Sequence, residues 1–124
     1  RKYVLTLNSY NRVDIGLDPF PYPGGATTAE ALWMGVPIIT MNGSHFLSHV
    51  GESVLTAAGF PQWIALSEAS YIEKAVNLSS NFEGLALIRD GLRKNVLKSP
   101  LFDASLFARD FQEVIHDMSE RLKR

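Results

Sequence analysis

The chain contains no cysteine, so disulfide bonds and thiolate metal sites are excluded, and the lack of disulfides fits a cytoplasmic protein. It also lacks an excess of charge of either sign. Twelve basic against 13 acidic side chains leave a net charge of −1, which offers no electrostatic footprint for nucleic acid or for an anionic membrane. No apolar run approaches the roughly 18–20 residues of a membrane-spanning helix, and no signal peptide is recognisable. We therefore expect a cytoplasmic protein with no nucleic-acid or membrane partner.

What the sequence does contain is the composition of a globular domain. Hydrophobic residues make up 46% and charged residues 20% of the 124 positions, enough for one domain with a core. Apolar periodicity and turn residues predict helices and strands in alternation. The expected helices cover residues 2–11, 27–34, 46–58, 68–78, 83–97 and 104–124, and the expected strands cover 13–17, 37–40 and 63–65.

The ends of these segments carry recognisable signals. Gly35 and Gly59 are expected to end the helices before them, and Ser67 and Asp103 to cap the helices after them. The last helix has a long apolar stripe, made of Phe107, Phe111, Val114, Ile115, Met118 and Leu122.

Strands that alternate with helices predict a parallel sheet with crossover helices. We expect an α/β fold with about three parallel strands, helices on both faces and a helical C-terminus. A doubly wound nucleotide-binding domain has about six strands, so half of the sheet is missing from this sequence. Residues 1–124 are accordingly predicted to be a single partial domain of a longer protein.

A proline-rich loop with two glycines connects the first strand to a helix. Gly24 and Gly25 leave the backbone N–H groups at the helix start unobstructed, as a phosphate site requires. Thr27 and Glu30 have the spacing of a capping box, in which each side chain bonds the backbone of the other. Spacing alone favours the capping box. The position of the loop at the carboxyl end of strand 13–17 favours a ligand, because open parallel sheets bind ligands there.

Two histidines and an acid fall at helical spacing after the second strand. His45, His49 and Glu52 stand at i, i+4 and i+7, so on one helix they would share a face that could ligate a metal. Two helix histidines without supporting hydrogen-bond partners are weak evidence, and we favour polar residues that line a surface or cleft. Trp33 and Trp63 are expected to pack in the core or against a neighbouring lobe.

Successive blocks of the chain resemble one family of enzymes. They are Arg12–Asp18, Asp18–Trp33, Glu30–Pro37, Ser48–Ser53, Ser99–Asp103 and Phe107–Arg109. In this order they are similar to the O-linked N-acetylglucosamine transferase and SPINDLY-like glycosyltransferases, in their bacterial form. The resemblance extends over nearly the whole chain.

The resemblance implies a GT-B architecture, in which two Rossmann-like lobes face each other across a cleft. The chain would be the C-terminal part of the second lobe, which binds the nucleotide-sugar donor, with UDP-N-acetylglucosamine as the expected donor. The donor's pyrophosphate would be held by the helix start, at Gly24, Gly25, Ala26, Thr27 and Thr28. Glu30 would bind the ribose hydroxyls. The resemblance implies no cofactor other than this donor substrate and no metal bound by the lobe.

Two positions depart from the family pattern but remain candidate donor contacts. Thr6 occupies the place of a histidine near the nucleotide base, and His49 stands for an arginine that would face the diphosphate. Animal members have a histidine where this chain has Gly25, although glycine is ordinary in the bacterial members. These departures leave alternatives open. One is a transferase that uses another sugar or an asparagine acceptor. The others are a degenerate lobe that binds a nucleotide or a protein, and a purely structural domain.

By the same resemblance the full-length protein would transfer N-acetylglucosamine to Ser or Thr of proteins. A helix N-terminus would stabilise the negative charge that builds on the departing diphosphate. No residue of the chain is assigned as a catalytic base. The resemblance places three features before Arg1. They are the catalytic base, a separate lysine near the diphosphate, and the helical repeats that recognise the acceptor. We expect the isolated piece to be inactive and to self-associate through its open strand edge and last helix.

Overall fold

The computed structural model describes residues 2–123 of the chain. Its helices are α1 (Lys2–Ser9), α2 (Ala26–Trp33), α3 (Val50–Ala58), α4 (Glu68–Ser80), α5 (Phe82–Val96) and α6 (Ala104–Leu122). Its strands are β1 (Gly16–Leu17), β2 (Ile38–Met41) and β3 (Ile64–Ala65). Short 3-10 turns are η1 (Tyr10–Arg12), η2 (Phe46–His49), η3 (Pro61–Trp63) and η4 (Pro100–Phe102). Within the described residues no helix is both long enough and apolar enough to cross a lipid bilayer.

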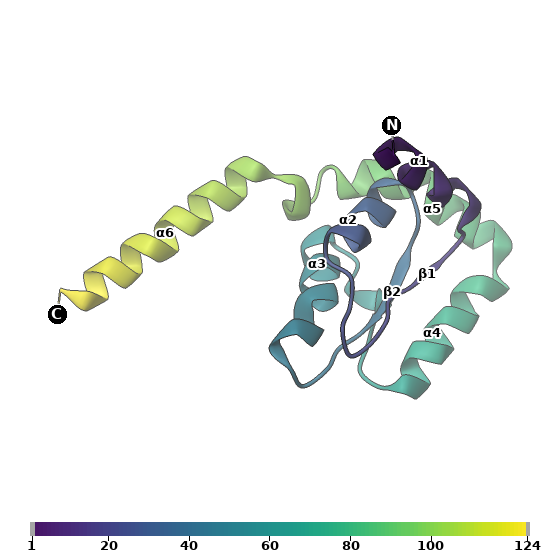
Figure 1. The fold of residues 1–124 in the computed structure, drawn as a ribbon, viewed down its shortest axis with the longest axis horizontal. Coiled ribbons are helices and arrows are strands. Elements are labelled where there is room, and N and C mark those ends of the chain that lie inside the picture. The colour runs from purple at the N-terminus through teal and green to yellow at the C-terminus, as the bar shows by residue number, and fades with distance from the viewer. Residues whose placement is uncertain (1, 124) are drawn as a thin grey trace.

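The three strands form one parallel sheet in the order β1-β2-β3. Gly16 pairs with Ile38, and Thr40 pairs with Ile64, so β2 is the central strand. Figure 1 shows α2 and α3 on one side of the strands and α4 on the other. The predicted α/β fold, with three parallel strands and helices on both faces, is confirmed.

The first strand is shorter than predicted. Residues 13–17 were expected to form a buried strand, but only Gly16 and Leu17 pair with β2, and Leu17 is 58% exposed. Within residues 2–123, β1 has a neighbour on one side only, because it lies at the edge of the sheet. A strand with one partner has fewer hydrogen bonds to hold it extended and less cover for its side chains. The prediction of burial at this strand is therefore wrong.

The core lies between the central strand and the helices that flank it. Its most buried large side chains are Leu32, Val36, Ile39, Leu55, Leu92 and Val96. Gly35 and Gly59 follow α2 and α3 with φ angles of 78° and 87°, which confirms the predicted helix ends. The two tryptophans pack as expected. Trp63 is buried and stacks on Phe60 with 4.5 Å between ring centroids, and Trp33 lies against Phe102.

The last helix leaves the body of the molecule. Asp103 Oδ1 accepts a hydrogen bond of 2.8 Å from the backbone N–H of Leu106, so the predicted N-cap is confirmed. Figure 1 shows α6 extending away from the sheet and from the other helices, connected to them through η4. All the residues of its apolar stripe are exposed. Its amphipathic pattern is correct, but within the described chain the stripe covers nothing.

Candidate functional site

The glycine loop and two helix starts meet at the carboxyl end of the sheet. Residues 18–25 follow β1 and lead into α2, which begins directly after Gly25. A Cβ built on Gly25 would lie 3.6 Å from Val50 Cγ1, the first residue of α3. The first turns of α2 and α3 therefore converge on Gly25. The first turn of α2 has backbone N–H groups without helical partners, at the positive end of its dipole. Helix α3 instead continues from η2, and its Val50 N–H donates to the Leu47 carbonyl.

The two glycines of the loop have different surroundings. A Cβ on Gly24 would lie 2.6 Å from Thr27 Oγ1 and 2.7 Å from Thr28 Oγ1, so a larger residue fits there only if these two side chains shift. A Cβ on Gly25 would make one ordinary contact among the described residues, with Val50. Gly24 is required by packing, whereas the space at Gly25 is open.

The loop is tied to the sheet by a buried carboxylate. Asp18 is 5% exposed, its Oδ1 accepts a hydrogen bond of 2.7 Å from the Gly24 N–H, and its Oδ2 accepts one of 2.9 Å from Thr40 Oγ1. Burial raises the pKa of Asp18, while these two hydrogen bonds oppose the rise. Neither Asp18 nor Thr40 was predicted to have a role at the site. The available signal was an acid placed directly after a strand, at the edge where the candidate loop begins.

The backbone of Asp18 is held as well. Its N–H donates to the carbonyl of Ile39 on β2 at 2.9 Å, and its carbonyl accepts from the Tyr71 hydroxyl of α4 at 2.8 Å. The Tyr71 ring meets Phe20 edge to face, with 5.3 Å between centroids. The start of the loop is therefore bound to the central strand on one side and to α4 on the other.

The predicted capping box at the start of α2 is wrong. The N-cap position is taken by Gly25, with no side-chain cap, and Thr27 is already the second residue of the helix. The Thr27 carbonyl accepts a 3.3 Å hydrogen bond from the Tyr10 hydroxyl, and Glu30 Oε1 accepts one of 2.9 Å from the Tyr3 hydroxyl. Because the helix begins earlier than the spacing suggested, its first N–H groups are not covered by a side-chain cap.

Helix α1 lies against the second half of α2, where its Tyr3 hydroxyl bonds Glu30. Glu30 is part of a pocket of about 350 Å³, whose other lining residues are Tyr3, Leu7, Ala29, Trp33 and Phe102. The hydrogen bond to Glu30 raises the pKa of Tyr3. Thr6 is exposed and follows Tyr3 by three residues, which is close to one helical turn. The structure therefore places Tyr3 and Leu7 of α1 beside Glu30, and Thr6 on the same helix.

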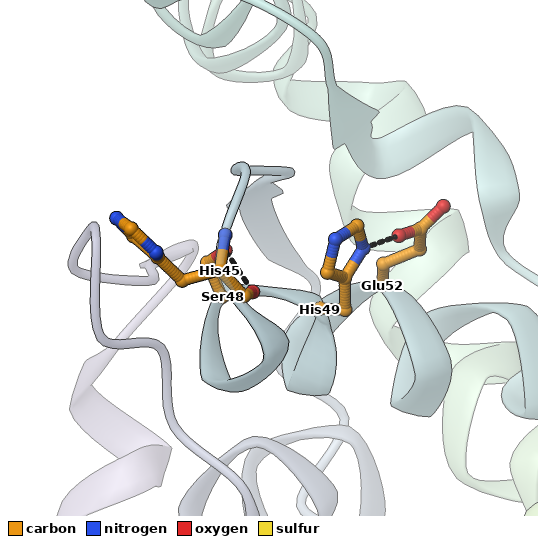
Figure 2. A network of polar contacts seen from close by, with 4 residues as sticks. All are labelled: His45, Ser48, His49 and Glu52. Carbon is orange, nitrogen blue, oxygen red and sulfur yellow. Dashed lines mark hydrogen bonds and ion pairs between the residues drawn. The ribbon is translucent and has the colours of Figure 1, made fainter.

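The histidines do not share a helix face. His45 has an extended backbone before η2, and residues 46–49 form a 3-10 turn, so the α-helical spacing does not apply. Figure 2 shows the His45 ring pointing away from His49, whose Nδ1 lies 2.7 Å from Glu52 Oε2. Among residues 2–123 no group of three or more His, Cys, Asp or Glu side chains is placed to hold a metal ion.

The turn between β2 and η2 is organised by Ser48. Its hydroxyl donates to the His45 carbonyl at 2.6 Å and accepts from the His45 N–H at 3.1 Å, as Figure 2 shows. Ser48 is buried, and a Cβ on Gly43 would lie 2.6 Å from its Oγ. This packing fixes the approach to α3, at whose N-cap position His49 stands.

Comparison with known proteins identifies the family of this fold and loop. The model of glycosyl transferase family 41 matches residues 10–111, which include the glycine loop and all three strands. The chain belongs to glycosyl transferase family 41. The predicted resemblance is thereby confirmed.

Individual members of family 41 are similar along most of the chain. SPINDLY of Solanum lycopersicum, named as a probable UDP-N-acetylglucosamine–peptide N-acetylglucosaminyltransferase, is 40% identical over 93% of the chain. The UDP-N-acetylglucosamine–peptide N-acetylglucosaminyltransferase of Caenorhabditis elegans is 31% identical over 87% of it. The structure of a Thermobaculum terrenum O-GlcNAc transferase variant superposes with a TM-score of 0.82, at 32% identity over 91% of the chain. The GT-B type of fold predicted for the chain is thereby confirmed.

The chain is a small share of each of these family 41 proteins. It spans 12% of the tomato protein, 9% of the nematode protein and 22% of the Thermobaculum chain. The activity of a whole family member therefore requires much more polypeptide than the residues described above.

Proposed function

We propose that the chain is the donor-binding part of a glycosyltransferase that transfers N-acetylglucosamine from UDP-N-acetylglucosamine to Ser or Thr of proteins. Membership of family 41 and the printed activities of the tomato and nematode relatives support this donor and acceptor class. Residues 1–124 would be the C-terminal part of the nucleotide-sugar-binding lobe. The catalytic base and the acceptor-binding repeats would lie in other parts of the protein, so the isolated chain would be inactive.

The convergence of the first turns of α2 and α3 on Gly25 carries this proposal. A diphosphate at this place would accept hydrogen bonds from the backbone N–H groups of residues 25–28 and would be stabilised by two helix dipoles. The open space at Gly25 lets an oxygen approach the backbone. As the bond to the sugar breaks, negative charge builds on the diphosphate, and these fixed dipoles would stabilise it without reorganisation.

The remaining donor contacts would come from α1, α2 and η2. Glu30 would bind the ribose hydroxyls, because a carboxylate that accepts one hydrogen bond from Tyr3 still has lone pairs for two hydroxyl donors. Thr6, on the neighbouring α1, would lie near the base. His49 would face the diphosphate through its Nε2, since its Nδ1 is held by Glu52.

Substitution of Gly25 tests this assignment in the full-length protein. We expect Gly25→Val to weaken UDP binding, measured by calorimetric titration, by roughly 100-fold or about 2.7 kcal/mol, because the branched side chain would occupy the phosphate position. The melting temperature should change little, since the new Cβ makes one ordinary contact, with Val50. Gly25→Ala should have a smaller effect. Gly91→Val, in α5 and remote from the loop, should leave UDP affinity unchanged.

Each outcome of this titration has a distinct meaning. Wild-type protein that does not bind UDP would contradict the donor-site proposal and favour a degenerate or structural lobe. Undiminished affinity in a folded Gly25→Val variant would remove the phosphate-loop assignment alone. Where UDP binds, mass spectrometry of peptides incubated with UDP-N-acetylglucosamine would distinguish transfer to Ser or Thr from transfer to Asn.

A further inference from the structure

We propose that Asp18 is a positioning residue for the donor. Its carboxylate fixes the peptide of Gly24, and through it sets the place of Gly25 and of the first turn of α2. This inference rests on the proposed donor site. It adds a residue that makes no donor contact itself but determines the geometry of the groups that do.

The hydrogen bonds of Asp18 connect the candidate phosphate loop to the central strand. Oδ1 accepts from the Gly24 N–H at 2.7 Å, one peptide before the point where α2 and α3 converge. Oδ2 accepts from Thr40 Oγ1 at 2.9 Å, and Thr40 is fully buried in β2. A single carboxylate therefore bridges the loop and the sheet, and its two oxygens have one partner each.

The packing around this bridge leaves it no room to shift. A Cβ on Gly51, in the first turn of α3, would lie 2.2 Å from Thr40 Oγ1 and 2.7 Å from Asp18 Oδ2. On the loop side, a Cβ on Gly24 would lie 3.2 Å from Asp18 Oδ1. Both close approaches occur at glycines, so backbone from α3 and from the loop encloses the carboxylate. Movement of Asp18 would move both helix starts.

A carboxylate directly beneath an anion site requires an explanation, because two negative groups repel each other. Asp18 is 5% exposed and its oxygens are turned toward Gly24 and Thr40. The acidic group is thus sequestered, and the Gly24 N–H that it occupies is aimed into the protein. The N–H groups that follow, from Gly25 onward, lie beyond this bond in the loop and the first turn of α2. Asp18 therefore orients the loop from its sheet side, away from the proposed phosphate position.

The charge and the shape of Asp18 can be separated by substitution. In Asp18→Asn the Oδ1 can still accept from Gly24, and the Nδ2 can donate to the Thr40 hydroxyl, which then acts as acceptor. Asp18→Ala loses both bonds. Thr40→Val keeps the size of the buried side chain and the Gly24 bond but leaves Oδ2 without its partner.

The experiment uses full-length protein and UDP as the probe, with affinity measured well below the melting temperature of each variant and scaled to the folded fraction. We expect Asp18→Ala to weaken UDP binding at least tenfold, Thr40→Val to weaken it severalfold, and Asp18→Asn to stay within about threefold of wild type, in line with the bonds each retains. The matched control is Asp14→Asn, the same change at an exposed acid four residues earlier, which should leave affinity unchanged. In steady-state assays the donor KM should rise in Asp18→Ala while the acceptor KM stays constant.

The controls separate this inference from the proposed function. If wild-type protein binds no UDP, the donor site itself is contradicted. If wild type binds and folded Asp18→Ala binds equally well, with a lower melting temperature, Asp18 is structural and the inference is overturned. If Asp18→Ala does not fold, Thr40→Val decides: wild-type affinity in that variant would overturn the bridge.

Discussion

Helices α5 and α6 have the same kind of apolar pattern and opposite surroundings. In α5, Leu85, Leu92 and Val96 are buried against the core, with exposures of 6%, 1% and 0%. In α6, Phe107 is 68% and Phe111 58% exposed. Periodicity thus identifies a helix and its apolar face in both cases. It does not say whether the partner of that face belongs to the same stretch of chain.

The largest expected effect is on the free energy of unfolding, which a substitution in α5 should lower far more than one in α6. Leu92→Ala should lower the free energy of unfolding by about 2–5 kcal/mol, because it leaves a cavity in the core. Phe111→Ala should change it by no more than about 0.5 kcal/mol at protein concentrations too low for association, because the ring is exposed. Chemical denaturation of the 124-residue chain measures both. A loss of several kcal/mol in Phe111→Ala would show that α6 packs on the body in solution.

An intermediate effect concerns association of the isolated chain. We expect it to sediment as a dimer or larger assembly, because the α6 stripe and the outer edge of β1 both present surfaces that favour contact. Combined Phe107→Ser and Phe111→Ser should reduce association and make the melting temperature independent of protein concentration, because the assembly no longer stabilises the folded state by mass action. A compact monomer with cooperative unfolding would contradict this expectation.

The smallest expected effect extends the contrast to charge. The acids of α6 are exposed, whereas burial raises the pKa of Asp18 above its ordinary value near 3.8. Between the ordinary pKa of Asp18 in the unfolded chain and its raised pKa in the folded one, the folded state binds more protons than the unfolded state. The contribution of Asp18 to stability therefore falls as the pH rises through this window. The melting temperature of wild type relative to Asp18→Asn should accordingly decline from acid pH upward and then level off. A difference that grows with pH would contradict the raised pKa.

Local signals predicted most of the elements correctly. Gly35, Gly59, Ser67 and Asp103 mark helix ends through backbone geometry or a cap bond that depends on a few neighbouring residues. Such signals depend only on residues close together in the sequence. For this reason the helices were predicted to within a few residues, while the length of β1, which depends on pairing partners, was not.

The candidate site was predicted in position but not in detail. The loop was placed correctly at the carboxyl end of β1, but Thr27 and Glu30 do not bond each other: the Thr27 carbonyl bonds Tyr10 of η1, and Glu30 bonds Tyr3 of α1. The bridge from Asp18 to Thr40 joins residues 22 positions apart, so it depends on how β1 and β2 are registered. His45 and Glu52 failed to share a face because a 3-10 turn interrupts the expected α-helix.

The central place of β2 couples the site to the global unfolding of the body. The Asp18 N–H bonds the Ile39 carbonyl, the Asn42 N–H bonds the Ala65 carbonyl, and the Thr40 hydroxyl reaches Asp18, so both loops of the site are attached to this one strand. Core strands exchange their amide hydrogens through the most costly openings of a protein. Opening of the glycine loop at its anchored end therefore requires hydrogen bonds to the central strand to break. A ligand bound there would hold that end closed and delay the unfolding of the body by mass action.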